Sequence, residues 1–299
     1  MFNKIVILEP VLITPEGRTR LSRFGREIVA YDTYCRDDQE TLDRIGDADC
    51  ILVSYRTVIS GYVLENCPQL RFICMCCSYY GPQYAKVDTV RATELGIKFA
   101  ALRGHGDNGV VEYALSQVIN LIQGVGPRRW REQTYDLTGV RVGILGLGEL
   151  GYKAARAFMA LGAPVWYYSR TRKPELEEEN LRYLPLEELL TTVDVLSVHL
   201  NRNVCLLDGD TLPLFSPNRI LVNTAVGQCC EPRALAEWLK TPDNYYIFDK
   251  VSLTQDTEPL RELSNVIYTD HITGDTKQCF ERATDQILHN LEAFLEHQS

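Results

Sequence analysis

Three glycines with the spacing Gly-x-Gly-x-x-Gly, at Gly146, Gly148 and Gly151, could form a turn that binds phosphates. An apolar run (140–145) precedes them, and a helical pattern (150–161) follows at once. In such a unit the glycines allow the tight turn, the approach of a pyrophosphate and close helix packing, and the helix start holds the phosphates. The context favours a dinucleotide site over a purely structural turn. Its predicted residues are Gly146, Leu147, Gly148, Glu149, Leu150 and Gly151.

A basic segment follows the next predicted strand and bears on which dinucleotide would bind. Ser169 lies 18 residues after Gly151, near the position where an acidic residue usually accepts a hydrogen bond from the ribose 2′-hydroxyl. This chain has no carboxylate there, and Ser169 is followed by Arg170, Thr171 and Arg172. Arginine can bind a phosphate bidentately, so the segment favours NADP(H) over NAD(H). The alternative is a solvated basic loop that balances the glutamates at 175 and 177–179.

Composition narrows the class of protein. A formal net charge of −9 over 299 residues argues against nucleic acid as the main partner. There is no apolar run of membrane-spanning length, and Met1 leads directly into a predicted strand without a signal peptide, so we expect a cytoplasmic protein. Its ten cysteines are then expected to stay reduced. The group at Cys74, Cys76 and Cys77 lacks a metal-ligand spacing, so no metal is expected.

Two series of alternating strand and helix patterns predict an α/β protein with parallel sheets. In the first series the strands are expected at 5–8, 28–31, 50–54, 72–76 and 97–100, and the helices at 15–24, 38–45 and 87–95. A longer helix is expected at 108–123. In the second series the strands are expected at 140–145, 165–168, 193–199, 220–225, 246–249 and 266–268. Its helices are expected at 150–161, 186–190, 209–215, 232–239 and 276–297.

The order of the motifs resembles the D-isomer-specific 2-hydroxyacid dehydrogenases, and in particular glyoxylate and hydroxypyruvate reductases. Besides the glycine loop, the resemblance is carried by Val111-Glu112-Tyr113-Ala114, by the segments 194–199 and 221–225, and by Asp270-His271-Ile272-Thr273-Gly274. It spans nearly the whole chain.

This resemblance implies two Rossmann-like domains, one flavodoxin-like and one dinucleotide-binding, with the active-site cleft between them. Residues 1–101 and 275–299 would form the substrate domain, and residues 102–274 the NAD(P)-binding domain. It also implies a homodimer through the nucleotide domains that involves the helix at 108–123. Further residues expected at the cofactor are His199, Thr224, Ala225, Asp249 and Gly274.

In the family a His donates a proton to the substrate carbonyl, a Glu orients that His, and an Arg binds the substrate carboxylate. His271 matches the His, although a structural histidine at a strand end is the alternative. The other two positions differ, because Val226 replaces the Arg and Thr254 replaces the Glu. Glu258 is a possible substitute, but its segment fits a later part of the family pattern better.

The residues that bind the substrate are therefore predicted to differ from those of the family. Cations that could replace the lost Arg are Arg56, Arg103 and Lys250, and an unusual loop offers Ser78, Tyr79 and Tyr80, with simple packing as the alternative. These features favour an NAD(P)-dependent oxidoreductase that reduces a carbonyl-type small molecule of a changed class. The alternative is a catalytically inactive NADP(H)-binding homologue that acts as a sensor or scaffold.

Overall fold

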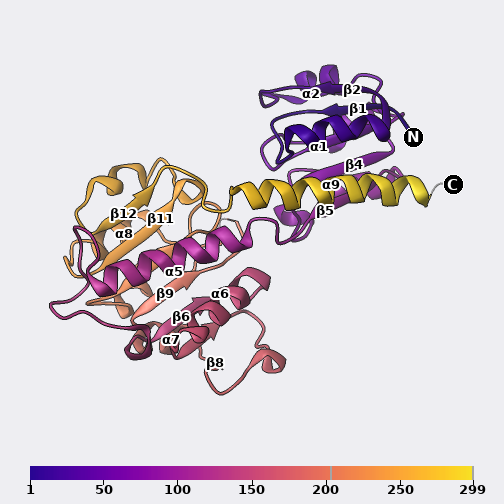
Figure 1. Ribbon diagram of the computed structural model, residues 1–299. Helices are drawn as coiled ribbons and strands as arrows, with labels where there is room; N and C mark the ends of the chain where they lie inside the picture. Colours follow the sequence, from indigo (N-terminus) through magenta and orange to yellow (C-terminus); the bar gives the residue numbers. More distant parts are fainter. Residues whose placement is uncertain (203, 298–299) are drawn as a thin grey trace. The chain divides into compact units, whose positions relative to one another are not determined.

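The computed structural model describes residues 1–202 and 204–297. They form two compact units, each with its own sheet (Figure 1). The first unit comprises residues 1–105 together with the C-terminal segment from Thr276, and the second comprises Gly106–Asp275. Within the described residues, no helix is long and apolar enough to cross a membrane.

The first unit is built on a parallel sheet with the strand order β2-β1-β3-β4-β5. Its strands are β1 (Phe2–Ile7), β2 (Gly25–Ala30), β3 (Cys50–Val53), β4 (Phe72–Ser78) and β5 (Lys98–Leu102). Its helices are α1 (Pro15–Arg20), α2 (Asp38–Ile45), α3 (Gly61–Glu65), α4 (Thr89–Glu94) and α9 (Lys277–Glu296). This order is the flavodoxin-like one, so the flavodoxin-like prediction is confirmed.

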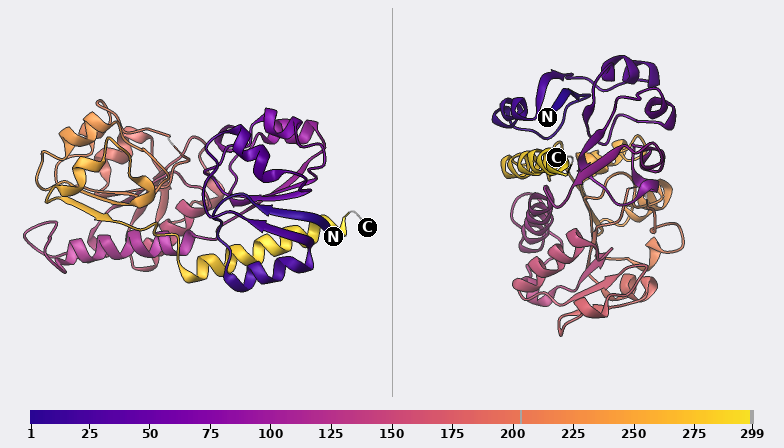
Figure 2. Two further views of the ribbon diagram at one scale, coloured as in Figure 1. Left: turned by 90° about the horizontal axis from the view of Figure 1, so that it is seen from above. Right: turned by 90° about the vertical axis from the view of Figure 1, so that its right-hand side faces the viewer.

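Both faces of this sheet are covered, because its strands point apolar side chains in both directions. One apolar cluster joins residues such as Ile5, Leu52 and Cys74 to Ile287 and Leu291 of α9. The other joins the intervening strand residues to α2, α3 and α4. Helix α9 thus returns the end of the chain to the first unit, where it lies beside α1 and along β4 and β5 (Figure 2).

The second unit contains a seven-stranded parallel sheet with the order β12-β11-β10-β9-β6-β7-β8. The strands are β6 (Val142–Leu145), β7 (Val165–Tyr168), β8 (Leu181–Tyr183), β9 (Val195–Val198), β10 (Ile220–Asn223), β11 (Tyr245–Asp249) and β12 (Val266–Thr269). The helices are α5 (Asp107–Gln123), α6 (Glu149–Ala160), α7 (Leu186–Thr192) and α8 (Pro232–Trp238). Read outward from β6, this is the dinucleotide-binding order, with a switch point between β6 and β9.

Three elements differ from the sequence-based expectation. Helix α3 and strand β8 were not predicted, since both are too short to show a clear hydrophobic period. The helix expected at 209–215 is wrong: only a 3₁₀ turn, Leu212–Leu214, forms there. Pro213 lies inside this turn, and Asp208 accepts hydrogen bonds from the backbone N–H groups of Asp210 and Thr211.

Candidate functional site

The glycine turn follows β6 directly and has the geometry of a phosphate cradle. Gly146 has a φ of +100°, and a Cβ atom there would lie 2.7 Å from the carbonyl oxygen of His199. A Cβ atom on Gly151 would lie 2.0 Å from the carbonyl oxygen of Gly146, so only glycine lets α6 approach the strand so closely. At Gly148, by contrast, an added Cβ would meet nothing within 4 Å among the described residues outside its own turn and helix, which leaves open space beside the turn.

Helix α6 begins at the open side of this turn. Its N-cap is Gly148, a residue without a side chain that could cap the first backbone N–H groups. These donors and the positive helix end suit an anionic ligand. Glu149 is exposed, Leu150 is half-buried, and Leu147 is buried in the core, so Leu147 contributes to the site through its backbone only. The residues present thus fit a pyrophosphate.

The basic segment after β7 contains two arginines, Arg170 and Arg172, which lie in different settings. Arg172 donates from Nε and Nη2 to both carboxylate oxygens of Glu177, at 2.7 and 2.8 Å. Hydrogen bonds from Arg172 lower the pKa of Glu177 to about 2. Arg170 is exposed, and the part of the chain that the structure describes offers it no ion pair. The Ser169 hydroxyl donates to the carbonyl oxygen of Thr171 at 2.6 Å. Of the two arginines, Arg170 has the free guanidinium.

Two buried polar atoms at the carboxyl edge of the same sheet have no hydrogen-bond partner among the described residues. They are Nδ1 of His199, which follows β9, and the hydroxyl of Thr224, which follows β10. The His199 Nε2 atom contacts the Ser197 hydroxyl at 2.9 Å, and burial lowers the pKa of His199 to about 4. A bound ligand would satisfy such orphaned groups, so this edge also fits a dinucleotide. Ala225, next to Thr224, is 9% exposed.

Asp249 ends β11 and is fully buried. Its carboxylate accepts hydrogen bonds from the backbone N–H and the hydroxyl of Thr273, at 3.0 and 2.8 Å, and from the Ser252 hydroxyl at 3.3 Å. Ser252 also contacts the carbonyl oxygens of Asn223 and Ala225, at 3.0 and 2.8 Å. Burial raises the pKa of Asp249 in spite of these donors. The network therefore locks the ends of β10 and β11 together.

His271 lies just beyond β12, on the same edge of the sheet, and is exposed. Its Nδ1 atom contacts the Thr269 hydroxyl at 2.7 Å, and its backbone carbonyl accepts from the Lys250 N–H at 3.3 Å. Asp270 points elsewhere: it accepts from the Tyr268 hydroxyl at 2.9 Å and pairs with Lys250 at 3.3 Å. Hydrogen bonds from Tyr268 and then Lys250 lower the pKa of Asp270.

The positions of the family's Arg and Glu hold residues that cannot replace them. Val226 is 37% exposed, and the Thr254 hydroxyl contacts the Thr257 hydroxyl at 3.1 Å. Glu258 pairs with Arg261 at 2.8 Å. The residue that contacts the His271 ring is Thr269, which ends β12 and which sequence reasoning missed. Because His271 lies beyond the end of the strand, the alternation of side chains along a strand did not identify this contact.

The substrate candidates of the first unit occupy different settings. Ser78, which ends β4, and Tyr79 are partly buried, and the Tyr79 hydroxyl contacts the Thr89 hydroxyl at 3.2 Å while its ring packs on Phe99. Tyr80 is 62% exposed. Arg56 lies over the rings of Tyr34 and Tyr55, with its Cζ atom 4.9 and 5.6 Å from their centroids. The Arg103 backbone is bonded to Gln286 of α9.

Gly274 has a packing role that the sequence did not reveal. It is buried, and an added Cβ atom would lie 3.4 Å from the carbonyl oxygen of Gly106 and from the Val110 side chain. A glycine here lets the segment before α9 pass close to the start of α5.

The two parallel sheets and the glycine cradle define a two-domain α/β protein of the dinucleotide-binding class, and comparison with known proteins agrees with this. The family model described as "D-isomer specific 2-hydroxyacid dehydrogenase, NAD binding domain" matches residues 113–273. The chain belongs to this family and is an NAD(P)-dependent oxidoreductase.

Named relatives cover most of the chain. It is 28% identical to a hydroxypyruvate reductase of Blautia hydrogenotrophica, over 98% of this chain and 97% of that protein. It is 31% identical to a glyoxylate reductase of Thermococcus gammatolerans, over 85% of this chain and 81% of that protein. The structure of a D-lactate dehydrogenase from Aquifex aeolicus, complexed with NAD and lactic acid, shares the fold. Its TM-score is 0.81 at 19% identity, over 99% of this chain and 96% of that one.

Proposed function

We propose that this protein reduces a small 2-oxo acid or a similar acid-bearing carbonyl compound, with NADPH as the preferred hydride donor. The observation that carries the proposal is His271, which lies at the edge of the sheet where the glycine cradle opens. Its Nδ1 atom is held by Thr269, and among the described residues no side chain forms a hydrogen bond with its Nε2 atom. The names of the relatives, glyoxylate and hydroxypyruvate reductase, point to the same substrate class.

The chemistry requires a hydride and a proton. When bound, the reduced nicotinamide supplies the hydride that the carbonyl carbon takes up. His271 donates the proton from Nε2 to the carbonyl oxygen, so that a hydroxyl group forms and the imidazole is left neutral. Thr269 fixes the ring from the other side, the role that the family gives to a Glu. His199, Thr224, Ala225 and Asp249 would line the nicotinamide end of the cofactor site.

The acid group of the substrate requires a cation, since Val226 cannot supply one. Lys250 is already paired with Asp270. The structure anchors only the backbone of Arg103, to Gln286. The guanidinium of Arg56 is held against two aromatic rings and, within the described residues, forms no ion pair. We therefore assign the substrate carboxylate to Arg56, with Ser78 and the exposed Tyr80 as further contacts.

The preference for NADPH rests on Arg170. With Arg172 held by Glu177, the guanidinium of Arg170 and the hydroxyl of Thr171 are the groups in this segment that we assign to the 2′-phosphate. We also propose a homodimer through the second unit that involves α5, as the family resemblance implies.

A second candidate function is binding of NADP(H) without catalysis, as a sensor or scaffold. The observation that favours it is the loss of two family side chains at Val226 and Thr254, with no carboxylate in contact with His271 among the described residues.

The experiment that tests these functions is a turnover screen with the full-length protein. NADPH and NADH oxidation is measured with glyoxylate, hydroxypyruvate, a simple ketone and an aldehyde, and NADPH affinity is measured separately. His271→Gln should lower turnover by at least about 100-fold and leave the Kd for NADPH unchanged. The matched control is His289→Gln on the exposed side of α9, which should change neither quantity. Tight NADPH binding with no turnover of any compound would establish the second function instead.

A further inference from the structure

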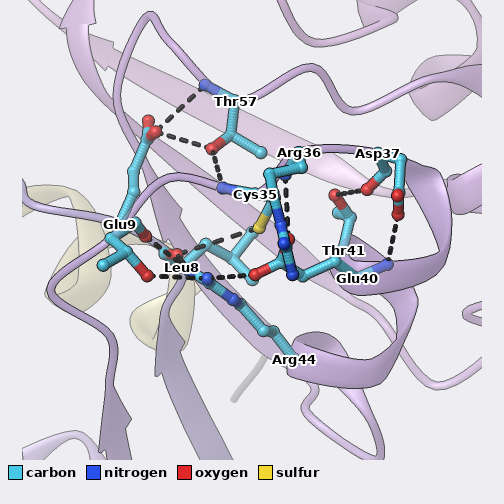
Figure 3. A network of polar contacts seen from close by, with 10 residues as sticks. Leu8, Glu9, Cys35, Arg36, Asp37, Glu40, Thr41, Arg44 and Thr57 are labelled. Atoms are coloured by element: carbon cyan, nitrogen blue, oxygen red, sulfur yellow. Dashed lines mark hydrogen bonds and ion pairs between the residues drawn. The ribbon is translucent and has the colours of Figure 1, made fainter.

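Glu9 lies just after β1 at the carboxyl edge of the first sheet, next to the switch point between β1 and β3 where ligands of such sheets bind. Its side chain is fully buried and crosses to the segment after β3 (Figure 3). The carboxylate accepts from the backbone N–H groups of Ser54 and Thr57, at 2.7 and 3.0 Å, and from the Thr57 hydroxyl at 2.6 Å. Two of its donors thus flank the dipeptide Tyr55-Arg56.

The same network also anchors the loop after β2. The backbone N–H of Cys35 donates to the Thr57 hydroxyl oxygen at 3.3 Å. On the other side, Arg44 of α2 donates to the carbonyl oxygens of Leu8 and Thr33, at 2.8 and 2.5 Å (Figure 3). Tyr34 lies between Thr33 and Cys35, so both of its neighbours are tied to the network.

The loop after β2 and the loop after β3 together hold the guanidinium of Arg56 in place. The ring of Tyr34 from one loop and the ring of Tyr55 from the other lie against Arg56. The neighbouring arginines of the network are neutralised, because Arg36 and Arg44 both pair with Glu40, at 2.9 and 2.5 Å. Stacking and the hydrogen bond with Tyr55 orient the planar fork of Arg56, which has five N–H donors and so can also meet a carboxylate.

A buried carboxylate whose donors are backbone N–H groups and a hydroxyl is costly to keep charged, and one charge that offsets part of this cost is that of Arg56, which interacts electrostatically with Glu9. Among the described residues Glu9 forms no ion pair, although Arg44 contacts the adjacent carbonyl of Leu8. A loop that served only as a connection would not need this carboxylate.

We propose that Glu9 is a positioning residue for substrate recognition: it fixes the Arg56 and Tyr34 loops so that the guanidinium meets the carboxylate of a small 2-oxo acid. This inference rests on the proposed function, which assigns the substrate carboxylate to Arg56. Glu9 does not touch the substrate itself, and it acts through the two backbone N–H groups and through Thr57.

The test uses the full-length protein saturated with NADPH, and the probe is oxalate, a dicarboxylate that cannot be reduced. Oxalate binding is measured by calorimetry, together with KM and kcat for glyoxylate. Glu9→Gln and Arg56→Ala should each raise the Kd of oxalate and the KM by at least tenfold, which is about 1.4 kcal/mol, while kcat changes far less. The double variant should be no weaker than Arg56→Ala alone, because both changes remove one interaction.

Asp49 offers a matched control at the opposite edge of the same sheet. It is 3% exposed and accepts from the backbone N–H groups of Asn3 and Lys4, both at 3.0 Å. Asp49→Asn should lower stability but leave oxalate binding unchanged. If Glu9→Gln does not fold, Thr57→Val cuts the link to Cys35 while keeping both backbone hydrogen bonds, and it should still raise the Kd of oxalate.

The outcomes separate this inference from the proposed function. If wild-type protein does not bind oxalate, or Arg56→Ala binds it normally, the assignment of Arg56 fails, and the role of Glu9 fails with it. If Arg56→Ala weakens binding but Glu9→Gln and Thr57→Val do not, only the positioning role is overturned. Equal weakening by Glu9→Gln and Asp49→Asn would show general destabilisation and would also overturn it.

Discussion

Replacement of Arg170 by alanine tests whether the basic segment after β7 selects NADPH. The reasoning depends on the contrast between two arginines that are two residues apart. Arg172 gives two hydrogen bonds to Glu177, whereas Arg170 has no ion pair among the residues described. Only Arg170 should therefore be free to meet a 2′-phosphate, a group that NADH lacks.

The expected magnitude follows from the setting of Arg170. A hydrogen bond to a charged group contributes about 1.5–3 kcal/mol when partly buried, but exposed ion pairs contribute about 1 kcal/mol or less. Arg170 is exposed, so we expect a loss of about 0.5–1 kcal/mol, which raises the Kd for NADPH roughly 2- to 5-fold. The Kd for NADH should stay the same. Arg172→Ala should change the Kd for NADPH by less than about twofold, since its fork is already occupied.

The assay is fluorescence titration of both reduced dinucleotides with wild-type protein and the two variants, at low and high salt. Added salt should shrink the difference between wild type and Arg170→Ala for NADPH, because an exposed charge pair is screened. Glu177→Gln provides a further check, since it weakens the hold on Arg172 and should tighten NADPH binding. Equal weakening of NADPH and NADH by Arg170→Ala, or a larger effect from Arg172→Ala, would refute the reasoning.

The remaining predictions concern the glycine turn, the lost arginine and the buried histidine. Gly151→Ala should lower the free energy of unfolding, because its Cβ would meet the Gly146 carbonyl at 2.0 Å. Gly148→Ala should keep the free energy of unfolding but weaken dinucleotide binding. Chemical denaturation and dinucleotide titration distinguish the two variants, and equal losses of stability would contradict this prediction. Val226→Arg should raise glyoxylate turnover, and an unchanged kcat/KM would show that the lost Glu also matters. The pKa of His199 falls from 6.5 to about 4 on folding, so the unfolded chain binds more protons between these values. Stability should therefore drop by up to roughly 3 kcal/mol as the pH falls through this window, and His199→Gln should flatten that slope in urea unfolding.

Much of the fold could be predicted because its signals are local. The helix at 108–123 and the strand at 165–168 follow from apolar periodicity, and the structure places α5 and β7 there. Short elements without a full period, such as β8, and the proline-containing turn at 212–214 could not be predicted in this way. Side-chain partners could not be predicted from local patterns either: the family pattern predicted His271, but its contact with Thr269 required the structure.

The sequence by itself determined the cradle, because a positive φ at Gly146 and the close approach at Gly151 are backbone requirements that only glycine meets. It also determined that Val226 stands where the family has an arginine. The tertiary structure decided which charges are available. Arg172 is held by Glu177, while Arg56 is stacked on Tyr34 and Tyr55, in a loop whose backbone is bonded to Glu9, 45 or more residues away. The reason is physical: backbone conformation depends on neighbouring residues, whereas the availability of a charge depends on burial and on partners that only folding brings near.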